Sequence, residues 1–234
     1  MGTYYFPACG FGFWYLLGKW QAMSKTDTDV YIGSSAGSLV CVCSLISHPQ
    51  LFDVVIGSAL ETFSRYKRAT RGLNLHTLVS LFLDELERHI DATRVQKHLA
   101  QIRIQLTEIK GFTMRRHQIQ PTSWHHLREL CMASCYIPII SNCNYRLCYI
   151  VDGMACIDGA FADLYAPNRW QTFDVSPHRG LSFPSLKQAT RMYLIGLYES
   201  DDTSLVVFRM LNPFYIACMV TFLCVGYVAS TMRC

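Results

Sequence analysis

Short apolar runs alternate with longer amphipathic stretches along this chain, a pattern that predicts strands and helices in turn. Apolar side chains recur every third or fourth residue over residues 75–90, which is the spacing of one helix face. Over residues 101–109, isoleucine and leucine instead alternate with polar residues, as in a strand with one buried side. The other expected strands are at 3–6, 29–32, 145–151, 154–157 and 191–198, and the other helices at 13–23, 38–46, 52–71 and 124–135. We expect residues 167–185 to be a loop, and the whole to be a three-layer α/β/α fold with a mainly parallel sheet.

Two of the expected helices carry groups of charged residues. The helix expected at 52–71 ends in a basic group made of Arg65, Lys67, Arg68 and Arg71. The helix dipole favours cations at this position, and the same cations could contact lipid headgroups. In the next helix the carboxylates lie beyond the apolar stripe, so we expect a solvent-exposed face formed by Asp84, Glu85 and Glu87.

The composition fits one folded domain with a large core. Of 234 residues, 51% are hydrophobic and only 16% are charged, which excludes a disordered chain. The net charge of +4 is small, and no basic stripe with interleaved aromatic residues is present, so we expect no nucleic-acid partner. The high apolar content and the mild positive charge favour a lipid partner, such as a membrane or lipid-droplet surface.

The cysteines indicate reduced thiols. There are 11 of them, an odd number in no disulfide-like spacing, and we expect no cleavable signal peptide at the start of the chain. We therefore expect buried free thiols in an intracellular protein. Cys131 and Cys135 could share a helix face, but no second pair at zinc spacing accompanies them, so we expect no metal site. Nothing in the sequence indicates another cofactor.

The last part of the chain differs from the rest. Residues 211–231 carry no charge, and Arg209 and Arg233 flank them. A stretch of ~20 residues can cross the hydrocarbon layer as a helix. We therefore divide the chain into one folded domain at 1–210 and a candidate membrane-anchoring helix at 211–231. The alternative is a terminal helix buried in the domain.

A serine lies in a turn of small residues after the second expected strand. Gly33-Ser34-Ser35-Ala36-Gly37 has the pattern G-x-S-x-G, and an apolar run that can form a helix follows it. A strand, a sharp turn and a helix are the context of a nucleophile elbow. Small residues on both sides of Ser35 permit this turn and close packing of the helix.

A glycine-containing loop follows the first expected strand. Gly10, Phe11 and Gly12 lie between that strand and the start of a helix. Backbone N–H groups at such a position can face an anion. Together with the serine turn one strand–helix unit later, this loop could supply an oxyanion hole, although it could also be a plain connection.

Three stretches in this order resemble the patatin-like phospholipase family. They are residues 6–18, similar to the family's oxyanion loop and following helix, the serine turn at 33–37, and the motif Asp158-Gly159-Ala160. Residues 133–138 are also similar to the family. The resemblance extends over about residues 3–213.

The resemblance implies a Ser–Asp dyad. Ser35 would be the nucleophile and Asp158 its general base, with no histidine required, and Gly10, Phe11 and Gly12 would form the oxyanion hole. The implied activity is that of a lipid acyl hydrolase, which cleaves a carboxylic ester through an acyl-serine intermediate.

Several alternatives remain open in the sequence. Asp152 is followed by glycine and is a second candidate base, and a conventional triad would use His178, the only histidine after Asp158. Ala8 and Phe13 stand where the family usually has glycine, and a positive φ at either would strain the loop. The protein could therefore also be a catalytically degenerate lipid-surface protein, or an acyltransferase that uses the same serine.

Overall fold

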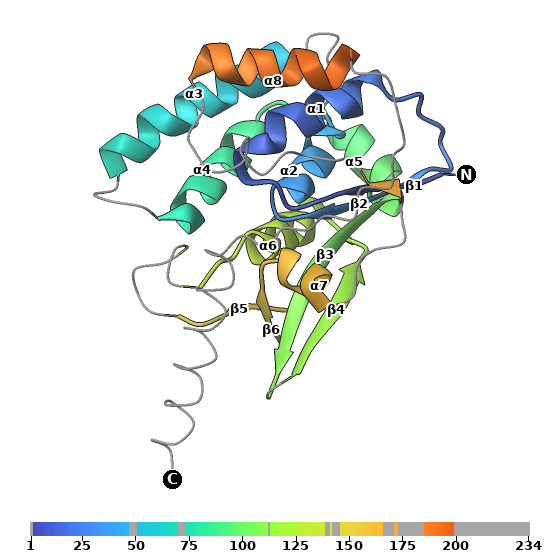
Figure 1. Cartoon of the computed structure of the whole chain (residues 1–234), viewed down its shortest axis with the longest axis vertical. Helices are drawn as coiled ribbons and strands as arrows, with labels where there is room; N and C mark the ends of the chain where they lie inside the picture. The colour runs from blue at the N-terminus through green and yellow to red at the C-terminus, as the bar shows by residue number, and fades with distance from the viewer. Residues whose placement is uncertain are drawn as a thin grey trace.

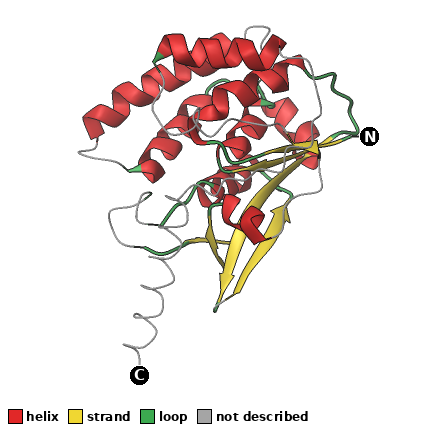
Figure 2. Ribbon diagram, in the orientation of Figure 1, coloured by secondary structure: helices red, strands yellow, loops and turns green. Residues whose placement is uncertain are grey.

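A central sheet with helices on both faces forms the described part of the computed structural model (Figures 1 and 2). The structure describes residues 2–46, 51–69, 74–111, 113–138, 141, 146–165, 171–172 and 185–198. The strands are β1 (Thr3–Phe6), β2 (Val30–Ser34), β3 (Ile102–Lys110), β4 (Thr113–Ile119), β5 (Tyr149–Val151), β6 (Met154–Ile157) and β7 (Gln171–Thr172). The helices are η1 (Gly10–Gly12), α1 (Phe13–Ala22), α2 (Ala36–Cys43), α3 (Leu51–Ala69), α4 (Leu75–Glu87), α5 (Ala92–His98), η2 (Leu99–Gln101), α6 (Trp124–Ser134), α7 (Ala160–Tyr165) and α8 (Leu186–Tyr198).

The sheet has a parallel centre and an antiparallel side. The strand order is β5-β6-β3-β2-β1-β7, and β4 pairs with β3 in addition. Strand β1 runs parallel to both β7 and β2, and β2 runs parallel to β3. Strands β4 and β6 run antiparallel to β3, and β5 runs antiparallel to β6. The predicted α/β fold with a mainly parallel sheet is confirmed.

Two strands approach each other along one edge of β3. Strand β2 ends with Ser34 opposite Gln105, and the antiparallel β6 ends with Ile157 opposite Thr107. Because β4 occupies the other edge of β3, both strands must lie on the same edge. The residues that follow β2 and β6 therefore meet opposite the middle of β3.

The period-two alternation of the strands separates two faces of the sheet. Phe6 and Leu106 belong to the main hydrophobic core, together with side chains of α1, α2, α4 and α6. Their neighbours along the strands, Tyr5, Gln105 and Thr107, hydrogen-bond to α7. Figure 1 shows α7 in front of β3, apart from the helices stacked around α2. The second face is thus polar where α7 covers it.

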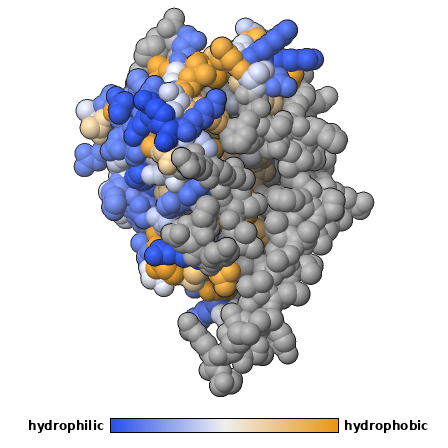
Figure 3. Space-filling model, turned by 90° about the vertical axis from the view of Figure 1, so that its left-hand side faces the viewer, coloured by the Kyte–Doolittle hydropathy of each residue, from blue (hydrophilic) through white to orange (hydrophobic). Residues whose placement is uncertain are grey.

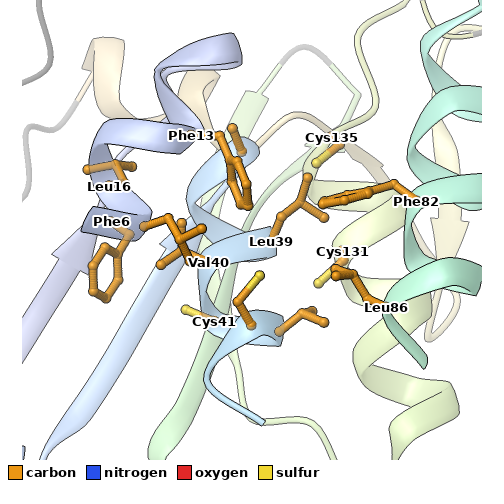
Figure 4. Close-up of a cluster of buried hydrophobic side chains, with 14 of the residues drawn as sticks. Phe6, Phe13, Leu16, Leu39, Val40, Cys41, Phe82, Leu86, Cys131 and Cys135 are labelled. Carbon is orange, nitrogen blue, oxygen red and sulfur yellow. The ribbon is translucent and has the colours of Figure 1, made fainter. Parts of the chain in front are cut away.

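The main core combines aliphatic, aromatic and thiol side chains. Phe13 of α1 meets Phe82 of α4 edge to face, with ring centroids 5.8 Å apart. Figure 4 shows Leu39 of α2 and Cys135 beside this aromatic pair. Seven free cysteines are found in the described residues, and six of them are buried. The expectation of buried free thiols is confirmed for these six, whereas Cys148 is only partly buried.

Helix α8 corrects a prediction. We expected a strand at residues 191–198, but the structure shows the helix Leu186–Tyr198. Its buried residues include Ala189, Met192, Tyr193 and Gly196, a spacing of three or four that one helix face provides. A Cβ on Gly196 would lie 2.1 Å from the Tyr15 carbonyl oxygen of α1, so the two helices are in close contact. This long-range packing decides the conformation of a short apolar run that fits either structure.

The position of Glu85 also differs from the prediction. We expected it on a solvent-exposed face, but it is buried between α4 and α3 and accepts hydrogen bonds from Arg65 and Arg88. Arg68 of the predicted basic end also has an acidic neighbour, Glu61, 3.7 Å away. Figure 3 shows hydrophilic residues gathered on the face that carries the end of α3. Two cations of the basic end therefore have acidic partners within the described residues: Arg65 pairs with Glu85 of α4, and Arg68 pairs with Glu61 of its own helix.

Further elements differ from the expected pattern. Strand β4 and helices α5 and α7 were not predicted, β7 lies within the expected loop, and β5 is shorter than expected. Residues 211–231 and His178 lie outside the described residues. Within the described residues, no helix combines the length and the apolar character that a membrane span requires.

Candidate active site

Ser35 occupies the sharp turn between β2 and α2. Its backbone has φ 52° and ψ −125°, a combination that residues other than glycine seldom adopt. The turn is crowded: a Cβ on Gly37 would lie 2.0 Å from the Phe6 carbonyl oxygen, and one on Gly33 would lie 2.6 Å from the Gly37 carbonyl oxygen. Only glycine fits at these two positions, so α2 can begin directly above β1 and β2.

Asp158 lies directly opposite this serine. It follows β6 and precedes α7, and the converging ends of β2 and β6 bring it to the serine turn. The Ser35 hydroxyl donates a hydrogen bond to Asp158 Oδ2, with 2.6 Å between the oxygens. The alternative acid, Asp152, lies in the β5–β6 turn, exposed to solvent, with its Oδ2 2.9 Å from His126 Nε2. The structure therefore brings together Ser35 and Asp158, and leaves Asp152 outside.

Burial changes the acidity of Asp158. Its side chain is fully buried, and this burial raises the pKa of the carboxyl group from 3.8 to about 7. Hydrogen bonds from the Ser35 hydroxyl and from the Ala160 N–H, the latter 2.9 Å from Oδ1, lower the pKa and limit the rise. Such a carboxylate can accept and release a proton near neutral pH.

Three residues that we did not predict hold the Ser–Asp pair in place. Ser134 Oγ accepts a hydrogen bond from the Ser35 N–H at 2.8 Å and donates one to the Gln105 carbonyl at 2.8 Å. Thr107 donates to the Asp158 carbonyl at 2.9 Å. Ser134 lies in the stretch 133–138 that resembles the family, but no local signal indicated its contact with Ser35.

The glycine loop forms the 3₁₀ helix η1 and leads directly into α1. Its positive φ of 52° falls on Gly10, whereas Phe13 has φ −40° and Ala8 has no positive φ. The absence of glycine at 8 and 13 therefore does not strain this backbone. Gly12 donates its N–H to the Cys9 carbonyl at 2.9 Å. Gly10 and Phe11 come before Gly12 in the turn, and the first N–H groups of a helical turn have no acceptor within it. These two N–H groups are therefore the better candidates for contact with an anion.

Two thiols lie near the Ser–Asp pair. Cys9 and Cys135 are buried, and burial together with the nearby Asp158 carboxylate raises the pKa of both thiols. A thiol is a strong nucleophile only as a thiolate, so the serine is the better candidate nucleophile. In the described part of the chain, no group of three or more His, Cys, Asp or Glu side chains could hold a metal ion.

Comparison with known proteins identifies the family of this chain. The family model described as patatin-like phospholipase matches residues 6–165, which is more than half of the chain. The chain therefore belongs to the patatin-like phospholipase family, whose members are in general lipid acyl hydrolases. A search of curated proteins gives no match to the chain.

Proposed function

We propose that this protein hydrolyses carboxylic esters of lipids, with Ser35 as nucleophile and Asp158 as general base. One observation carries the proposal: a serine in a strained turn donates a 2.6 Å hydrogen bond to a fully buried carboxylate. Strained backbone and buried acids cluster at functional sites, because folding alone seldom favours either of them.

The proposed reaction has two steps. Ser35 Oγ attacks the ester carbonyl carbon and its proton passes to Asp158; the N–H groups of Gly10 and Phe11 stabilise the oxyanion. Collapse of this intermediate breaks the bond to the alcohol, which leaves with the proton from Asp158, and the acyl group remains on Ser35. Water then attacks the acyl-serine and passes a proton to Asp158. The bond to Ser35 Oγ breaks, this oxygen takes the proton back from Asp158, and the fatty acid is released.

A single carboxylate suffices as base because its pKa is close to neutral. An acid with a pKa of about 3.8 would be a weak proton acceptor at neutral pH. Burial moves the pKa of Asp158 to about 7, where Brønsted behaviour makes proton transfer most effective. Histidine is therefore not required in this mechanism.

The test compares wild type with Ser35→Ala, Asp158→Asn and the exposed control Asp152→Asn. We expect fatty-acid release from phosphatidylcholine or triacylglycerol to be lost in the first two variants and kept in the control. Labelling by a fluorophosphonate probe should likewise depend on Ser35. Hydrolysis by folded Ser35→Ala would overturn the proposal, and a folded wild type that is neither labelled nor active would support the non-catalytic alternative.

We also propose an intracellular membrane or lipid surface as the place of action, with residues 211–231 as anchor. The support is the uncharged length of this stretch in the sequence. Deletion of the residues after 212 should release the protein from pelleted membranes. Unchanged pelleting of the shortened chain would refute the anchor without affecting the proposed chemistry.

A further inference from the structure

A polar network that the proposed mechanism does not use lies on the α7 face of the sheet. Its centre is Asp163 of α7, which accepts hydrogen bonds from Tyr5 of β1, Gln105 of β3 and Arg116 of β4. Arg116 lies opposite Thr107 in the β3–β4 pair, so it shares a face with Gln105. Gln105 Nε2 also lies 3.0 Å from the Tyr5 hydroxyl. Three strands and one helix thus contribute to one cluster.

This network connects to both members of the Ser–Asp pair. On the side of the base, Gln105 Nε2 donates to the carbonyl of Gly159, the residue after Asp158, at 3.0 Å. On the side of the nucleophile, the Gln105 carbonyl accepts the hydroxyl of Ser134, which in turn holds the Ser35 N–H. A displacement of Gln105 would therefore move both reacting groups.

The central carboxylate is partly buried and is paired with a cation. The side chain of Asp163 is 26% exposed and that of Arg116 is 23% exposed, with 2.9 Å between Oδ1 and Nη2. Burial raises the pKa of Asp163, whereas the hydrogen bonds from Tyr5 and Gln105 and the charge of Arg116 lower it. Burial has the larger effect, so the pKa of Asp163 stays above its ordinary value of 3.8, and the contacts with Tyr5, Gln105 and Arg116 limit this rise.

The charge of Asp163 acts on the base itself. The groups that face Asp158 are the Ser35 hydroxyl, the thiols of Cys9 and Cys135, and the Asp163 carboxylate. Within this set Asp163 contributes a negative charge, which adds to the effect of burial and raises the pKa of Asp158. The groups that face Asp163 are the Tyr5 hydroxyl, Arg116 and Asp158.

We infer that Asp163 is a positioning residue of the Ser35–Asp158 pair: with Tyr5, Gln105 and Arg116 it fixes the turn after β6 and places a second negative charge behind the base. The inference rests on the proposed function. It assigns to the α7 face a role in setting the pH range of the enzyme.

The test is the pH profile of kcat/KM for Asp163→Asn beside wild type and the control Asp152→Asn. Asparagine has nearly the same shape but no negative charge, and Arg116 stays in place, so Asp158 should lose its proton at lower pH. We expect the acidic limb of Asp163→Asn to move to lower pH. The limb of the control should not move.

A second variant covers the case in which Asp163→Asn does not fold. Tyr5→Phe removes one hydrogen bond to Asp163 and keeps the packing, so Asp163 should be protonated more readily and the limb should move in the same direction by a smaller amount. A rate that falls equally at every pH, with an unmoved limb in the folded variants, would overturn the inference and indicate a purely structural role.

Failure of the proposed function would look different. In that case Ser35→Ala would remain active, or the wild type would have no hydrolysis to profile. If Ser35→Ala and Asp158→Asn are inactive but Asp163→Asn and Tyr5→Phe keep the wild-type limb, only the role of Asp163 is refuted.

Discussion

Asp158→Asn should make the protein inactive and more stable. Asparagine can keep both hydrogen bonds of the carboxylate: its Oδ1 can accept from the Ala160 N–H, and its Nδ2 can donate to Ser35 Oγ. The substitution therefore removes mainly the ability to ionise inside the protein. Because ionisation of a buried carboxyl group opposes folding, the free energy of unfolding should rise.

The magnitude follows from the two pKa values of Asp158. In the folded protein the pKa is about 7, against 3.8 for the ordinary group. Three pH units correspond to roughly 4 kcal/mol. Below the lower value both states bind the proton and no penalty exists. Between the two values the native state holds a proton that the unfolded chain has released, so wild type loses stability as the pH rises, and above the upper value the full penalty is present.

Urea unfolding of wild type and Asp158→Asn between about pH 4 and pH 8 measures this difference, with Asp152→Asn as the exposed control. The advantage of Asp158→Asn should be small at the acid end and reach roughly 4 kcal/mol at the alkaline end. A difference that does not depend on pH would refute the argument from burial. A variant less stable than wild type at pH 8 would show that asparagine cannot keep the hydrogen bonds.

Three further predictions concern the same site. The kcat/KM of wild type should rise with pH through about 7, as Asp158 loses its proton, and a flat profile from acid to alkaline pH would exclude it as the base. Gly37→Ala should abolish folding, because its Cβ would overlap the Phe6 carbonyl of β1. The control Gly57→Ala has open space around it on α3 and should raise the free energy of unfolding by up to about 1 kcal/mol. Equal thermal melts of the two variants would contradict the prediction for Gly37. Ser134→Ala should lower kcat about tenfold and destabilise the fold by about 1–3 kcal/mol, because the Ser35 N–H loses its acceptor. An unchanged kcat of the folded variant would show that this hydrogen bond does not position the nucleophile.

The sequence alone determined the local features of the site. An apolar run followed by G-x-S-x-G predicted a strand, a turn and a helix around Ser35, because small residues and apolar spacing act over a few neighbouring positions. Asp158 came from resemblance to a family, since no spacing rule connects two residues that are 123 positions apart. The periodicity of apolar residues also identified most of the helices and most strands of the sheet.

The tertiary structure decided what depends on distant partners. The apolar run of α8 is compatible with a strand or a helix, and its contact with α1 selects the helix. Glu85 is buried because Arg65 of the neighbouring helix supplies its counter-charge. The roles of Ser134, Gln105 and Asp163 arise only when β2 and β6 converge on one edge of β3. Local patterns encode burial and backbone preference, but the order of strands in the sheet determines which polar groups meet.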